Sequence, residues 1–137
     1  MTAYLLDTNA LIWIGTEARL EAGAVQALNI AAQDGTPVTV SPYSAWEIGL
    51  LTARNRIRLP SEPATWFKTI LKAGKLKLAP LTPDILIASS FLPGTPPNDP
   101  ADRIIIASAR STDTTIITRD RLILAYAGEG HVRAIAC

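Results

Sequence analysis

Short runs of aliphatic and β-branched residues recur along this chain between longer segments of helical period. The runs are Tyr4-Leu5-Leu6, Val38-Thr39-Val40 and Thr115-Ile116-Ile117. Strands that are apolar on both faces are typical of a parallel sheet, which needs helical crossovers to connect its strands. This alternation therefore predicts an α/β domain with a mostly parallel, buried sheet.

Turn residues place the helices between these runs. Gly35 follows one helical segment, Pro60 and Pro63 bracket the start of another, and Pro83 stands at a first-turn position. A short helical turn is also expected after Arg119. The predicted helices span residues 8–15, 21–34, 42–54, 62–73, 83–91 and 100–111.

Composition limits the class of protein. The chain has 137 residues, of which 48% are hydrophobic, so we expect one domain spanning residues 1–137 with a sizeable core. No apolar run reaches the roughly 18 residues of a membrane helix, and no targeting leader is predicted. The only cysteine is Cys137, which excludes an internal disulfide and argues against a thiolate site. We expect a soluble, cytoplasmic protein.

Positive charge is concentrated in one segment. Residues 54–77 carry a net charge of +6, and the rest of the chain carries −5. Such separation suits a face that binds a polyanion such as RNA, but a solvated helical face with lysines at i, i+4 spacing explains it equally well. The basic residues are Arg54, Arg56, Arg58, Lys68, Lys72, Lys75 and Lys77.

Two acids follow predicted strands. Asp7 comes directly after Tyr4-Leu5-Leu6, and Asp120 comes shortly after Thr115-Ile116-Ile117. Ligands of open parallel sheets bind beyond the carboxyl ends of the strands, so both acids are candidate site residues. The alternative for each is a helix N-cap, a role that Asp favours.

Two further acids belong to predicted helices. Glu47 shares a helical face with Tyr43 and Leu51. Burying a carboxylate on such a face is costly unless another group compensates its charge, which makes Glu47 a candidate site residue. The alternative is that its side chain reaches solvent at the edge of that face. Asp99 precedes a proline and is expected to be an N-cap, with Asp102 at the start of the same helix. Arg103 is placed to pair with Asp99.

Taken together, the acids predict a metal site. Four carboxylates at strand ends and helix starts repel one another, and a hard divalent cation with oxygen ligands is the usual compensation. His131 is the only histidine and is expected to be a surface or strand residue. No pattern of histidines or cysteines suggests zinc.

Four segments in order resemble PIN-domain proteins, and more narrowly the VapC toxins of toxin–antitoxin pairs. These segments are Tyr4 to Trp13, Ser44 to Gly49, Asp99 to Ala107 and Ile117 to Asp120. The resemblance implies a three-layer α/β/α sandwich and a Mg²⁺- or Mn²⁺-dependent endoribonuclease that hydrolyses RNA. It also implies a VapB-type antitoxin as partner and a homodimer.

The same resemblance assigns the site. It implies that Asp7, Glu47, Asp102 and Asp120 form the metal pocket. Asn9 and Thr118 are then close by, and Asp99 supports the pocket from outside the ligand set.

One alternative function remains open at this point, which is a PIN-fold module that binds RNA without cleaving it. A phospho-acceptor receiver is disfavoured because a single acid follows the first strand and no lysine follows Lys77. A phosphatase with an Asp-x-Asp motif is disfavoured by Asn9. The tryptophans Trp13 and Trp46 are interpreted as core residues rather than as platforms that stack a base.

Overall fold

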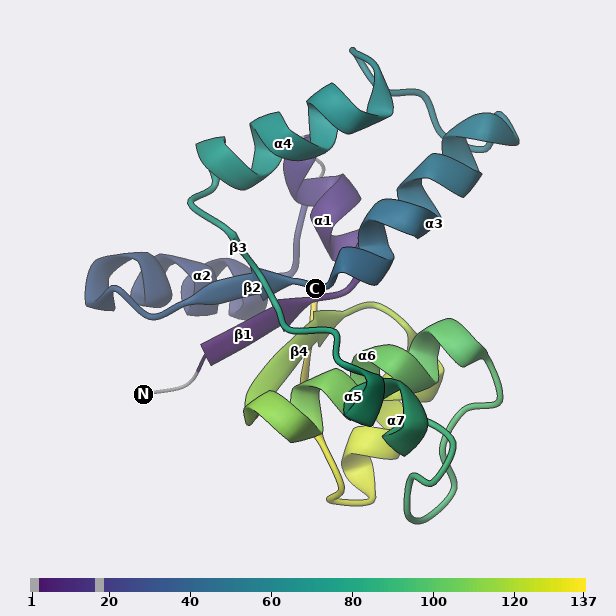
Figure 1. Ribbon diagram of the computed structural model, residues 1–137. Coiled ribbons are helices and arrows are strands. Elements are labelled where there is room, and N and C mark those ends of the chain that lie inside the picture. Colours follow the sequence, from purple (N-terminus) through teal and green to yellow (C-terminus); the bar gives the residue numbers. More distant parts are fainter. Residues whose placement is uncertain (1–2, 17–18) are drawn as a thin grey trace.

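Five parallel strands form one sheet at the centre of the molecule (Figure 1). The computed structural model describes residues 3–16 and 19–137. The sheet has the order β3-β2-β1-β4-β5, and every neighbouring pair is parallel, which confirms the predicted sheet type. The strands are β1 (Ala3–Leu6), β2 (Val38–Val40), β3 (Lys77–Leu78), β4 (Thr114–Thr118) and β5 (Arg133–Ala136).

Helices cover both faces of this sheet. In Figure 1, α1 to α4 lie on one side of it and α5 to α7 on the other, so the fold is the predicted three-layer α/β/α sandwich. No helix within residues 3–16 and 19–137 is long and apolar enough to cross a membrane. The helices are α1 (Thr8–Gly15), α2 (Ala22–Asp34), α3 (Pro42–Ala53), α4 (Pro63–Ala73), α5 (Pro83–Ala88), α6 (Pro100–Thr112) and α7 (Arg121–Gly128).

Alternate strand residues form two separate cores. Successive side chains of a strand point to opposite faces. Leu6 and Ile117 therefore join the core beneath α1 to α4, while their neighbours Leu5 and Ile116 join the core beneath α6 and α7. All four side chains are fully buried, which explains why these strands are apolar runs without polar alternation.

Four element predictions differ from the structure. The short edge strands β3 and β5 were not predicted. The helix expected over 83–91 ends at Ala88, because Ser90 and Phe91 donate to the carbonyls three residues earlier in tight turns. The short turn expected after Arg119 is a helix of eight residues, α7.

The order of the strands creates a crevice. From β1 the sheet continues through β2 to β3 on one side, whereas β4 and β5 extend it on the other side. The connections that follow β1 and β4 therefore leave the sheet in different directions at neighbouring strand ends. Such a switch point is where ligands bind in open α/β sheets, and Asp7 and Asp120 lie there.

The packing of α1 on α4 gives a test of the upper layer. A methyl group at Gly15 would collide with the ring of the buried Trp66 and come within 3.2 Å of the Ile70 side chain. We expect Gly15→Ala to lower the free energy of unfolding by about 1–3 kcal/mol in urea denaturation. The control is Gly23→Ala in α2, where the methyl group meets nothing within 4 Å and a gain of up to about 1 kcal/mol is expected. Equal effects at the two glycines would contradict this packing.

Candidate active site

Asp7 caps a helix with one carboxylate oxygen and contacts the neighbouring strand with the other. It is 6% exposed, and its side-chain Oδ1 accepts from the Ala10 amide at 2.8 Å, which caps α1. Its other oxygen, Oδ2, accepts from the buried hydroxyl of Thr118. The two interpretations left open by the sequence are therefore compatible.

Thr118 joins the ends of two neighbouring strands. Its side chain is fully buried at the end of β4, donates to Asp7 and accepts from the Asp120 amide at 2.9 Å. Asp120 in turn caps α7, with Oδ1 accepting from the amides of Leu122 at 2.8 Å and Ile123 at 3.1 Å. A single hydroxyl thus fixes the relation between the two acids.

Glu47 is held in the site by two hydroxyls that the sequence analysis missed. The Thr8 hydroxyl donates to Glu47 Oε1 at 2.5 Å and lies 2.9 Å from Ser44 Oγ. Because the Thr8 hydroxyl has one hydrogen, Ser44 is the donor of the second bond. The sequence contained a signal for both residues, because Thr8 directly follows Asp7 and Ser44 shares the helical face of Glu47.

Asp102 lies at the start of α6 beside its cap. Asp99 accepts from the Asp102 amide at 3.0 Å, which confirms Asp99 as the N-cap. The predicted pairing of Arg103 with Asp99 is wrong, because the Arg103 guanidinium donates to the Ser89 carbonyl at 3.3 Å, on the segment that follows α5. In the described part of the chain the one ion pair joins Arg133 and Asp113, so no cation pairs with these acids there.

Burial and mutual repulsion raise the pKa of Asp102 to about 7. Loss of solvent is the larger cause, and the negative charges of Asp120, Asp99, Asp7 and Glu47 add to it in that order. Three acids from other segments, Asp7, Glu47 and Asp120, are thus within electrostatic reach of Asp102, as is Asp99, the cap of its own helix.

The pKa values of Asp7 and Glu47 are raised as well. Burial is the larger cause for both. For Asp7 the hydrogen bond from Thr118 opposes the rise, and for Glu47 the bond from Thr8 does so. The hydroxyls therefore stabilise charged carboxylates that their surroundings disfavour.

The donor set suits a hard divalent cation. It consists of carboxylate oxygens that no basic side chain of the described residues neutralises, and burial followed by mutual repulsion raises the pKa of Asp102. Within residues 3–16 and 19–137, however, no three such side chains are already arranged to hold an ion. A cation would therefore have to draw the acids closer together.

The remaining predicted residues lie around this centre. Asn9 is exposed, and its backbone amide hydrogen-bonds to Asp7. The basic residues of segment 54–77 are all exposed on the end of α3, the following turn, α4 and β3.

The prediction that Trp46 belongs to the core is wrong. Trp46 is 59% exposed on α3, one residue before Glu47. Trp13 is half-buried and packs on the core, with the Arg119 guanidinium 3.8 Å above its ring. The sequence did not distinguish these cases, because the face of α3 that packs on the rest of the protein depends on the tertiary structure.

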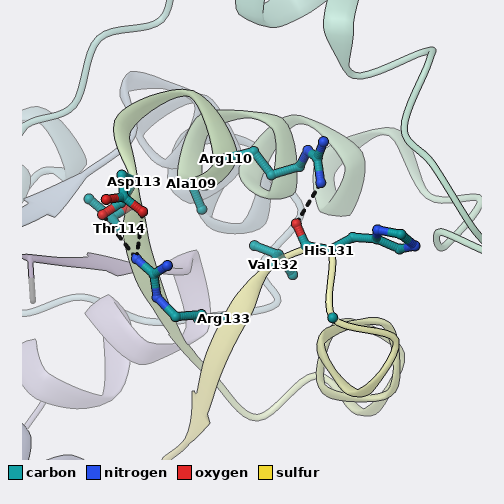
Figure 2. A pocket seen from close by; sticks show the side chains of 8 residues that line it. Ala109, Arg110, Asp113, Thr114, His131, Val132 and Arg133 are labelled. Carbon is teal, nitrogen blue, oxygen red and sulfur yellow. Dashed lines mark hydrogen bonds and ion pairs between the residues drawn. The ribbon is translucent and has the colours of Figure 1, made fainter.

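A separate pocket lies between the end of α6 and the start of β5 (Figure 2). There Arg133 pairs with Asp113 at 2.8 Å, and Arg110 donates to the His131 carbonyl at 2.5 Å. His131 is half-buried just before β5, with its ring 5.7 Å from that of Tyr126. None of the candidate acids lines this pocket, so it is distinct from the carboxylate site.

Comparison with known proteins places this chain in a family. Residues 4–129 match the PIN domain. The chain belongs to the PIN-domain family. It is 30% identical over 127 residues to ribonuclease VapC22 of Mycobacterium tuberculosis, a match that covers 92% of this chain and 93% of the relative.

Solved structures share the fold at lower identity. A chain of VapBC2 from Rickettsia felis, crystallised with a promoter DNA fragment, matches with a TM-score of 0.69 and 12% identity over 98% of both chains. A chain of VapBC-5 from M. tuberculosis, a member of the VapBC family of toxin–antitoxin systems, matches with a TM-score of 0.63 and 20% identity over the full length of both. These matches establish the architecture.

The raised pKa of Asp102 predicts how stability depends on pH. Between the ordinary Asp value of 3.8 and about 7, the folded chain holds more protons at Asp102 than the unfolded chain does. Stability should therefore fall as pH rises through this interval. We expect Asp102→Asn, which keeps the backbone amide bonded to Asp99, to reduce this fall and to stabilise the metal-free protein above neutral pH.

The measurement is urea denaturation in EDTA at about pH 5 and about pH 8. The matched control is Asp84→Asn, because Asp84 is an exposed acid in the first turn of α5, outside the cluster. It should keep the wild-type pH dependence. An unchanged pH dependence in Asp102→Asn would contradict the assignment.

Proposed function

We propose that this chain is a metal-dependent endoribonuclease, the toxin of a VapBC-type toxin–antitoxin pair. The observation that carries the proposal is the convergence of Asp7, Glu47, Asp102 and Asp120 from four segments, with no basic side chain among residues 3–16 and 19–137 paired with them. The similarity to ribonuclease VapC22 supports the same activity. The reaction is hydrolysis of an RNA phosphodiester by an attacking water.

The proposed cofactor is Mg²⁺ or Mn²⁺, held by these four acids. When bound, such an ion lowers the pKa of the attacking water and offsets the charge of the phosphate. Both effects are needed here, because the acids alone would repel the RNA.

Each residue of the site has its own role in the proposed reaction. Asp7 and Asp102 are the first choices as ligands, and Thr118 orients Asp7 through its hydroxyl. Glu47 is a ligand or the general base, with Oε1 held by Thr8 so that the carboxylate keeps one orientation. Asp120 is a ligand or positions the water, and its capping bonds to α7 fix its place.

The proposed partner is a VapB-type antitoxin. Glu47, Asp102 and Asp120 are partly exposed, so an antitoxin arginine or lysine placed among the carboxylates would compete with the metal. Structures of VapBC2 and VapBC-5 share this fold, which supports a partner of that kind. We also propose a homodimer, as the family resemblance implies.

One observation favours a second function. Because no three acids within the described ranges are already arranged around an ion, the chain could bind RNA without cleaving it. The two functions differ in turnover, which a cleavage assay measures directly.

Cleavage should require a divalent cation. We expect the purified protein to cut total RNA in Mg²⁺ or Mn²⁺ and to stop in EDTA. Glu47→Gln should lower the rate by about 10²–10⁴-fold, the range expected for loss of a general base. Asp84→Asn, the exposed helix-start acid, should cleave like the wild type.

Two outcomes of the cleavage assay would contradict the proposal. Equal cleavage in EDTA would remove the metal mechanism. Retention of RNA without any cleavage, by a protein that melts cooperatively, would favour the silent module.

Salt dependence should locate the RNA-binding face. Each lost phosphate contact reduces the salt slope of single-stranded RNA binding by about 0.7. We expect the double variant Arg56→Glu, Arg58→Glu of Asp7→Asn protein to bind RNA with a flatter slope. The control is Arg110→Glu, since Arg110 lies in the last turn of α6, beside His131 and outside segment 54–77. An unchanged slope in the double variant would leave segment 54–77 as a solvated face.

A further inference from the structure

Trp46 is an exposed aromatic side chain that the proposed chemistry does not use. It is 59% exposed on α3, directly before Glu47, and its ring centroid lies 5.4 Å from that of Tyr43 at an angle of 43°. The other two tryptophans are enclosed, with Trp66 2% exposed and Trp13 half-buried beneath Arg119. Trp46 therefore presents an exposed indole ring, beside the site, that a bound molecule can contact.

Helix geometry places the aromatic pair next to the carboxylates. Tyr43 precedes Trp46 by three residues and Glu47 by four, so it neighbours both on the surface of α3. The charges of Glu47 and Asp99 both act on the Tyr43 hydroxyl, so the pair begins among the acids and Trp46 extends it outward.

Charge limits what can bind at this position. Along α3 the nearest arginine of the basic segment, Arg54, is seven residues beyond Glu47, roughly 10 Å away. Lys68 of α4 lies on the side of α3 that carries Ala45 and Gly49. Beside the acids, RNA therefore needs affinity that does not depend on attraction of its phosphates. Stacking of a nucleobase on an aromatic ring supplies it, and requires a base whose face is not covered by pairing.

We propose that Trp46, backed by Tyr43, stacks on an unpaired base of the RNA next to the phosphate that is cleaved. The inference rests on the proposed ribonuclease function and adds a substrate-binding residue to it. Trp46 then holds the RNA strand in register with Glu47, one residue away.

Fluorescence tests the contact without turnover. In Asp102→Asn protein, a short single-stranded RNA of mixed sequence should quench tryptophan emission in a saturable way. A strand of the same length built of abasic sugars should not. Adding Trp46→Phe should remove the quenching, because the remaining tryptophans are enclosed. Quenching that persists in Trp46→Phe, or that abasic RNA reproduces, overturns the inference.

Kinetics tests its role in the reaction. Loss of one stacked base corresponds to about a tenfold loss of affinity, so Trp46→Ala should raise KM about tenfold and leave kcat near the wild-type value. Trp46→Phe should restore most of the loss. The matched control is Phe91→Ala, since Phe91 is 80% exposed beside Arg110 and Ser111, at the other end of α6 from Asp102. It should leave KM and kcat unchanged.

The remaining outcomes are also decisive. An unchanged KM in Trp46→Ala overturns the inference, as does an equal rise in Phe91→Ala. A change in sedimentation of the free Trp46→Ala protein without a change in KM assigns Trp46 to a contact between copies of the chain and overturns it too. Absence of cleavage by the wild type would overturn the ribonuclease function alone, because the fluorescence experiment still decides whether a base stacks on Trp46.

Discussion

The buried hydrogen bond from Thr118 to Asp7 is the interaction on which the site depends. It joins the last residue of β4 to the residue that follows β1, and these strands are neighbours at the centre of the sheet. The Asp120 amide donates to the same hydroxyl, so one oxygen sets the spacing of two acids. Because a buried polar group without a partner is costly, this arrangement also favours one register of the two strand ends.

A second constraint is electrostatic. The site gathers carboxylates that burial and mutual repulsion disfavour, as the raised pKa values of Asp7, Glu47 and Asp102 indicate. The apolar sheet and the two cores beneath its helices make this possible, because their stability does not involve the acids. A ligand that neutralises the site, whether a cation or a basic side chain of a partner, therefore relieves this repulsion. Its binding stabilises the folded protein.

Patterns of neighbouring residues in the chain predicted the elements that depend mainly on local sequence. Apolar runs and turn residues indicated the central strands β1, β2 and β4 and the order of the helices, and Asp99 followed the N-cap rule. The sequence did not reveal β3 and β5, because short edge strands depend on a neighbouring strand for their existence. One contact of α6 needed the tertiary structure as well. Arg103 reaches the Ser89 carbonyl rather than Asp99, a carbonyl that only packing of α5 on α6 brings near.

Among the site residues, too, some could be predicted from local sequence and others depend on the tertiary structure. Asp7 and Asp120 were predictable because strand ends of a parallel sheet converge, whereas the pairing of Thr8 with Glu47 joins residues 39 positions apart. Exposure of Trp46 depends on which face of α3 packs on the rest of the protein, and the sequence alone does not reveal that face.

The acids of the site are stabilised in two different ways. Asp7 and Asp120 cap helices, and Asp102 lies in a first helical turn, so each has the positive end of a helix dipole and backbone amides close by. Glu47 lies within α3, away from the end of that helix, and receives a hydroxyl from Thr8 instead. Capping thus stabilises the charged form of the strand-end acids before any ligand binds, which is how one fold can keep several like charges together. Glu47 lacks that support, so its orientation depends on the Thr8 side chain, whose hydroxyl opposes the rise that burial gives to the pKa of Glu47.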